Sequence, residues 1–82
     1  MKVTVMLFAS FREATGAPTS VVELDQGTTV RSLWERMVET YPRLGPMSSS
    51  TAFAVNGNYT RSGEVTLHDG DEVAFLPPVS GG

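Results

Sequence analysis

Residues 29–41 constrain the fold most, because they form the one long stretch with the apolar spacing of an α-helix. The apolar side chains recur every three or four residues and so share one helix face: Val30, Leu33, Trp34, Met37, Val38 and Tyr41. Thr29 suits the N-cap, and Pro42 stops the helix. Tryptophan and methionine at this spacing indicate core packing rather than a cofactor pocket. One such helix covers a single face of a sheet and leaves the other face partly open.

Short segments on both sides of this helix have the alternating, β-branched pattern of strands. We predict five of them, at residues 2–8, 19–24, 52–55, 58–60 and 72–76. Asn56-Gly57 is the strongest hairpin signal in the chain, and residues 68–71 predict a tight turn into the last strand. The order strand, strand, helix and then further strands favours an α+β fold of the β-grasp type. In that fold the first and last strands lie parallel at the centre of a mixed, four- to five-stranded sheet.

The connecting segments are predicted from their turn and capping residues. Residues 10–16 indicate a single helical turn with Ser10 as N-cap and Gly16 as its stop. Residues 44–51, rich in Gly, Pro and Ser, indicate a mobile loop, and residues 65–67 a short strand or turn. We therefore expect a β-grasp domain over residues 1–76 and an extended tail over residues 77–82.

Composition narrows the class of protein. A chain of 82 residues forms one domain with one small core, and the lack of cysteine excludes disulfides, a thiol nucleophile and thiolate metal sites. The net charge of −3 and the scattered basic residues argue against a nucleic-acid surface. No apolar run reaches membrane-spanning length, and the first residues alternate in polarity, unlike a signal peptide. We expect a cytoplasmic protein that binds neither nucleic acid nor membrane.

No group of residues in the sequence has the pattern of an autonomous active site. His68 is the only histidine, and its place in a predicted turn indicates a solvent-exposed residue rather than a catalytic one. Asp69, Asp71 and Glu72 lack the further oxygen ligands of a calcium loop, so a turn explains them better than a metal site. We expect no bound metal or cofactor, and a function that depends on the end of the chain and its surface.

The last six residues, 77–82 (PPVSGG), are the strongest functional signal. Pro77 and Pro78 fix an extended path that projects the tail away from the sheet. Gly81 and Gly82 lack a Cβ and therefore fit a channel too narrow for other residues. The carboxylate of Gly82 is the candidate reactive group, and Gly81 is needed for passage. Because a carboxylate is inert to nucleophiles at neutral pH, it must be activated, usually by adenylation with ATP. A sulfur donor then yields a thiocarboxylate, whereas a lysine amine yields an isopeptide bond.

The open face of the predicted sheet is the candidate docking surface. Alternation directs one set of strand residues toward the helix: Val5, Leu7, Val73 and Phe75. Phe8 and Leu76 then point the opposite way, and Tyr59 joins them after the hairpin turn. The alternative is that Phe8 and Leu76 belong to a second core layer beneath residues 44–51.

The chain resembles the small, sulfur-carrying subunit of molybdopterin synthase (MoaD family), a ubiquitin-like β-grasp family. The resemblance spans nearly the whole chain and is strongest at its two ends, residues 5–13 (VMLFASFRE) and 69–82 (DGDEVAFLPPVSGG). It implies that an E1-like enzyme uses ATP to adenylate Gly82 and that a sulfur donor converts it to a thiocarboxylate. The tail, including Pro77, Pro78, Val79 and Ser80, then enters the large subunit of a heterotetramer, where the sulfur builds the dithiolene of molybdopterin from precursor Z.

Other readings of the tail remain open. A sulfur carrier for thiamine or tRNA thiolation uses the same chemistry. A ubiquitin-type protein modifier forms isopeptide bonds, although Lys2 is the only lysine on which chains of this protein could be built. A plain β-grasp interaction domain would have no reason to end in Gly-Gly.

Overall fold

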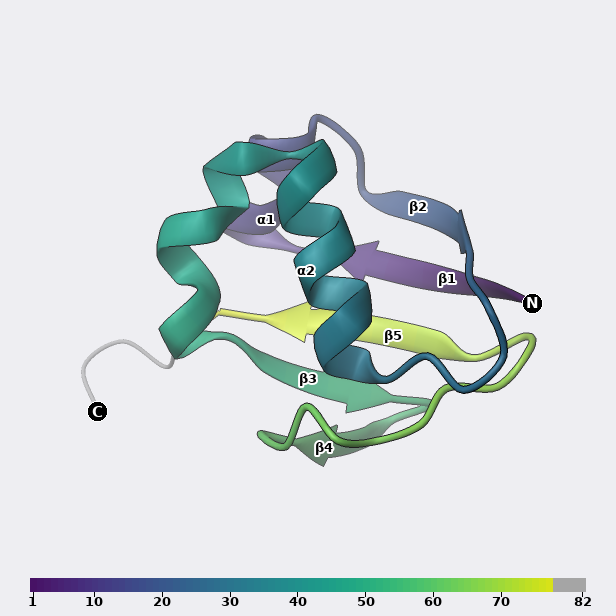
Figure 1. Cartoon of the computed structure of the whole chain (residues 1–82). Helices are drawn as coiled ribbons and strands as arrows, with labels where there is room; N and C mark the ends of the chain where they lie inside the picture. The colour runs from purple at the N-terminus through teal and green to yellow at the C-terminus, as the bar shows by residue number, and fades with distance from the viewer. Residues whose placement is uncertain (78–82) are drawn as a thin grey trace.

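The computed structural model of the chain describes residues 1–77. These residues form a five-stranded sheet with helices packed on one side (Figure 1). The elements in chain order are β1 (Lys2–Leu7), α1 (Ala9–Thr15), β2 (Thr19–Glu23), α2 (Val30–Thr40), the 3-10 helix η1 (Pro42–Ser50), β3 (Ala52–Val55), β4 (Asn58–Thr60) and β5 (Glu72–Leu76). None of the helices described is long and apolar enough to cross a membrane.

The sheet has the strand order β2-β1-β5-β3-β4, with β1 and β5 parallel and every other pair antiparallel. The register pairs Val5 with Val73 in the parallel pair and Phe53 with Phe75 in the neighbouring antiparallel pair. The predicted β-grasp arrangement, with the first and last strands adjacent at the centre, is confirmed.

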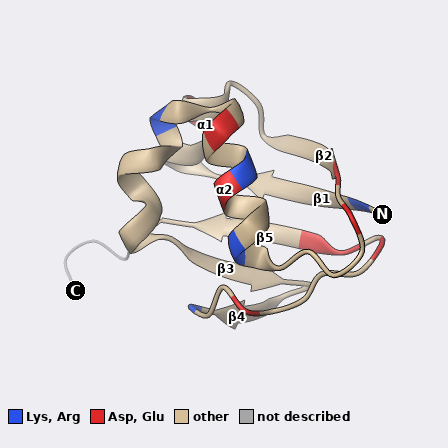
Figure 2. Cartoon of the chain, viewed as in Figure 1, with Lys and Arg blue, Asp and Glu red and all other residues tan. Residues whose placement is uncertain are grey.

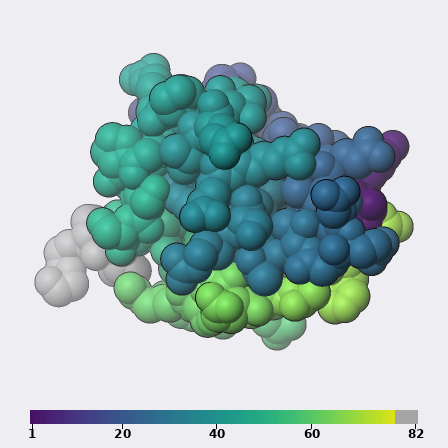
Figure 3. Space-filling view, in the orientation of Figure 1, coloured from purple at the N-terminus to yellow at the C-terminus, as the bar shows by residue number. Residues whose placement is uncertain are grey.

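The core lies between this sheet and the helices. Val5, Val73 and Phe75 are fully buried beneath α2, as the strand alternation predicts. The rings of Phe11, Trp34 and Phe75 pack edge to face, with 4.9 Å between the centroids of Trp34 and Phe75. In the space-filling view of this side, α2, η1 and the connecting segments hide most of the sheet (Figure 3).

The start of α2 is held by both its own cap and a distant loop. The side chain of Thr29 accepts a hydrogen bond from the Ser32 N–H, as the sequence predicts. The Val30 N–H donates to the Val65 carbonyl (2.9 Å), and the Arg31 N–H donates to the Gly63 carbonyl (3.0 Å). Residues 63–65 therefore complete the hydrogen bonding of the first helical turn.

The prediction of a mobile loop at residues 44–51 was wrong. Pro42–Ser50 form η1, in which Leu44 is fully buried and packs in the core. Trp34 donates its ring N–H to the Ser48 hydroxyl (2.8 Å), and the Thr51 hydroxyl donates to the Met47 carbonyl (2.7 Å). Tertiary packing of Leu44 and these side-chain bonds order a segment whose Gly and Pro content predicts a loop.

The start of α1 also differs from the prediction. The N-cap is Phe8, without a side-chain hydrogen bond, and Ser10 lies inside the helix. β1 ends at Leu7, one residue before the predicted end, because Ala9 takes a positive φ of 48° that turns the chain out of the sheet. Gly16 ends the helix in the left-handed conformation, as predicted.

Candidate functional site

The sheet face opposite the helices is open, and the strand register shows which side chains share it. Met6 pairs with Ala74, Ala74 with Ala54, and Ala54 with Tyr59, so these four residues form one row across the face. Met6, Ala54 and Ala74 are half-buried, whereas Tyr59 is 62% exposed. The row places two small alanines between the larger side chains of Met6 and Tyr59.

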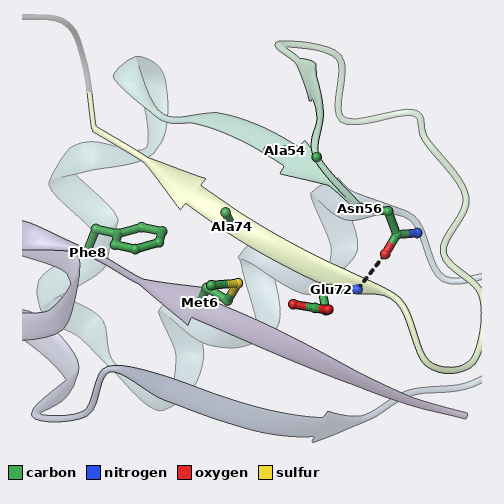
Figure 4. Close-up of a pocket in the computed structure, with 7 residues that line it drawn as sticks. Met6, Phe8, Ala54, Asn56, Glu72 and Ala74 are labelled. Atoms are coloured by element: carbon green, nitrogen blue, oxygen red, sulfur yellow. Dashed lines mark hydrogen bonds between the residues drawn. The ribbon is translucent and has the colours of Figure 1, made fainter.

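This face contains a shallow hollow that runs along β5 (Figure 4). It is lined by Met6, Phe8, Ala54, Asn56, Gly57, Glu72 and Ala74. In the close-up, the ring of Phe8 lies at the end where β5 finishes, and Glu72 and Asn56 lie at the end where it begins. The methyl groups of the alanines leave room above the central strands for an apolar side chain of a partner.

Phe8, Tyr59 and Leu76 are the docking residues predicted within the fold. Phe8 is 44% exposed, and Leu76 is half-buried at the end of β5, next in the chain to half-buried Pro77. The alternative of a second core layer is wrong, because η1 packs with α1 and α2 on the helical side and leaves this face uncovered. The docking role of the three residues stays a prediction.

The predicted tail residues beyond Pro77 lie outside the described part of the chain. They are Pro78, Val79, Ser80, Gly81 and Gly82. The described residues define only where this tail begins, at the end of the central strand β5.

The sequence prediction did not include Met6, Ala54 and Ala74 among the docking residues, although alternation already placed Met6 on the face of Phe8. The strand alternation that identifies Phe8 and Leu76 also identifies Met6 and Ala74, since each is two residues away along its strand. Ala54 gives a weaker signal, because β3 has only four residues and three of them are buried.

The end of the sheet where β5 begins is held by a carboxylate. Asp71 accepts hydrogen bonds from the Asn56 side-chain amide (2.8 Å) and from the His68 backbone N–H (2.7 Å). Both hydrogen bonds lower the pKa of the Asp71 carboxyl below its ordinary value, and the bond from Asn56 has the larger effect. His68 lies in a turn with its side chain 78% exposed, as predicted.

Charge is distributed unevenly between the two ends of β5 (Figure 2). Acidic residues gather where β5 begins, at Asp69, Asp71 and Glu72. Among residues 1–77, no three His, Asp or Glu side chains are arranged to hold a metal ion. At the other end of β5 and its neighbour β1 no acidic or basic residue follows directly, since Phe8 and Ala9 come after β1, and Leu76 and Pro77 end the described chain. The described chain therefore ends beside uncharged residues, of which Phe8 is exposed and Leu76 is half-buried.

Comparison with known proteins gives full-length matches. A molybdopterin synthase sulfur carrier subunit from Mycobacterium tuberculosis is 40% identical over 83 residues, covering 100% of this chain and 99% of that protein. The protein of the same name from Chlamydomonas reinhardtii is 36% identical over 83 residues, covering 100% of this chain and 100% of that protein.

Solved structures share the fold. A putative molybdopterin converting factor subunit 1 from Pyrococcus furiosus superposes with a TM-score of 0.87 at 33% identity, covering 96% of this chain and 99% of that one. SAMP1 from Haloferax volcanii also gives 0.87, at 28% identity, with both chains fully covered. A chain of the complex of subunits 1 and 2 of molybdopterin-converting factor from Helicobacter pylori gives 0.71 at 23% identity, with both chains fully covered, a likeness of fold alone. The model of the ThiS family matches residues 5–82, so this chain belongs to the ThiS family.

Proposed function

We propose that this chain is the sulfur-carrier subunit of a molybdopterin synthase and that the Gly82 carboxylate carries the sulfur. The full-length similarity to proteins of that name is the observation that carries the proposal. The fold supports it, because the central strand β5 leads directly into residues 77–82. The open face beside the start of this tail offers a surface on which a partner can dock.

The chemistry proceeds in two steps on the Gly82 carboxyl group. The Gly82 carboxylate attacks the α-phosphate of ATP, pyrophosphate leaves, and an acyl adenylate forms in the active site of an E1-like partner. A sulfide-level sulfur from a donor then attacks the acyl carbon, and AMP leaves with the original carboxylate oxygen. The product is a thiocarboxylate, whose sulfur is a better nucleophile than the carboxylate oxygen it replaces.

The proposed acceptor of the tail is the large subunit, which binds precursor Z and uses the sulfur to build the dithiolene. Two copies of each subunit form the proposed heterotetramer. Gly81 and Gly82 present no Cβ to the channel through which the terminal carbon has to pass.

Intact-mass analysis after incubation with an E1-like enzyme, ATP and sulfide tests the proposal. We expect a gain equal to replacement of one oxygen by sulfur, located at Gly82 by peptide mapping. We also expect the charged protein to form molybdopterin when the large subunit and precursor Z are added. A chain lacking Gly82 that transfers sulfur as well as the full chain would contradict the proposal.

A ubiquitin-like modifier is the second candidate, favoured by the structural similarity to SAMP1. In that role the acyl adenylate reacts with a lysine amine, AMP leaves, and an isopeptide bond forms. The same incubation in host extract separates the two functions. Conjugates that persist in reducing buffer and carry Gly82 on a lysine would support the modifier.

A further inference from the structure

Ala9 has a backbone conformation that its residue type disfavours. Six described residues have a positive φ, and five of them are suited to it: Gly16, Gly27, Asn56, Gly57 and Gly70. Glycine lacks the Cβ that clashes in this region, and asparagine tolerates it better than other residues. Ala9, with φ of 48°, is the remaining one and carries a Cβ into a conformation that disfavours it.

The strain at Ala9 gains no visible compensation from packing within the described chain. Ala9 is exposed, and it is not among the residues of the hydrophobic core or those packed against it. Burial of its methyl group therefore contributes little to the stability of the isolated fold. Glycine at this position would adopt the same backbone with less strain.

Ala9 lies at the end of the sheet where β5 runs into Pro77, and we call this end the base of the tail. The parallel pairing of β1 with β5 ends at Leu7 and Phe75, so Phe8 and Ala9, the first residue of α1, lie at the same end of the sheet as Leu76 and Pro77. Five residues separate Pro77 from the chain end, and fully extended they reach at most about 18 Å. A protein that takes Gly82 into a buried site must therefore approach the base closely.

We propose that Ala9 is a docking residue, whose exposed methyl group is buried against the large subunit when that subunit receives the tail. This inference rests on the proposed function. The large subunit is the expected occupant because it is the proposed acceptor of the tail. Phe8, which precedes Ala9 in the chain, lines the hollow of the open face, so one partner surface can cover both residues. Burial of the methyl group then stabilises the complex, although the exposed methyl group does not stabilise the free protein.

Replacement of Ala9 by glycine tests the proposal, because stability and binding should change in opposite directions. We expect Ala9→Gly to raise Tm by about 2–4 °C, since backbone strain is relieved. We expect its Kd for the large subunit, measured by calorimetry with the full chain, to rise about three- to tenfold, since a buried methyl is lost. Ala9→Asn, which also tolerates a positive φ, should weaken binding at least as much without lowering Tm.

Gly27→Ala is the reciprocal control. Gly27 has φ of 85° with open space around its Cβ position, and it follows β2 at the opposite end of the sheet from the tail. This variant should lose stability and keep the wild-type Kd.

Three results for Ala9→Gly would overturn the role of Ala9. They are an unchanged Kd for the large subunit, a lowered Tm, or a loss of affinity for the E1-like enzyme without a loss of affinity for the large subunit. Failure of wild-type protein to bind the large subunit would overturn the proposed function as well, so the wild-type measurement separates the two.

Discussion

At the scale of single residues, Asp71 joins the hairpin between β3 and β4 to the turn before β5. Its carboxylate accepts from Asn56 and from the His68 N–H, while the Asn56 side-chain oxygen accepts from the Glu72 N–H. These bonds lower the pKa of Asp71 in the folded protein, so the unfolded chain takes up the proton at a higher pH. The stabilisation by the Asp71 carboxylate is present at pH values above the ordinary carboxyl pKa. It is lost as the pH falls through the lower pKa that Asp71 has in the folded protein. We expect Asp71→Asn to lower the free energy of unfolding by about 1 kcal/mol at pH 7, with the difference from wild type shrinking below about pH 4.

Denaturant unfolding at a series of pH values measures this difference. Asp25→Asn is the control, because Asp25 is an exposed carboxylate whose side chain accepts no hydrogen bond among those described. A deficit for Asp71→Asn that stays constant from pH 7 to pH 3 would contradict the ionic part of the argument.

At the scale of elements, the joint between α2 and residues 63–65 depends on a glycine. Gly63 is buried, and a Cβ at this position would lie 2.7 Å from the Cβ of Arg31, so the loop or the helix must shift. We expect Gly63→Ala to destabilise the protein by about 1–3 kcal/mol, because the bonds to the start of α2 are displaced. In Gly45→Ala the new Cβ would meet Val38 at an ordinary 3.6 Å, and we expect a change within about 0.5 kcal/mol. Thermal unfolding measures both, and equal Tm values for the two variants would refute the tight joint.

At the scale of the whole molecule, one face of the sheet stabilises the fold and the other is exposed. The helical face holds the core, whereas the open face carries Phe8 and Tyr59, which the fold does not bury. We expect Phe8→Ala to weaken binding of the large subunit by a free energy on the order of 2 kcal/mol while leaving Tm nearly unchanged. Phe75→Ala, in the core, should cost about 3–5 kcal/mol of stability. Calorimetric titration and thermal unfolding separate the two effects.

Val21→Ala is the matched control for this prediction. Val21 is also an exposed apolar residue, at 67%, but it lies on the edge strand β2. A loss of affinity for Val21→Ala as large as that for Phe8→Ala would mean that binding is not centred near the tail.

The sequence by itself determined the elements whose signals are local. The stripe of Leu33, Trp34 and Met37 repeats within one helix, and Asn56-Gly57 encodes its turn in two adjacent residues. Strand alternation likewise assigned Phe75 to the core and Phe8 to the open face. The tail and its proposed chemistry also come from the sequence, since their evidence is the identity of residues 77–82.

Only the tertiary structure decided the features that depend on distant partners. Leu44 is buried and its segment helical because α1 and α2 provide a surface for it, and no local pattern in a Gly- and Pro-rich stretch encodes that contact. The contact of Gly63 with Arg31 joins residues 32 positions apart, and the positive φ of Ala9 opposes the preference of its residue type. The physical reason is the same in each case. Local propensities differ by about 1 kcal/mol or less, so packing against residues far away in the chain overrides them.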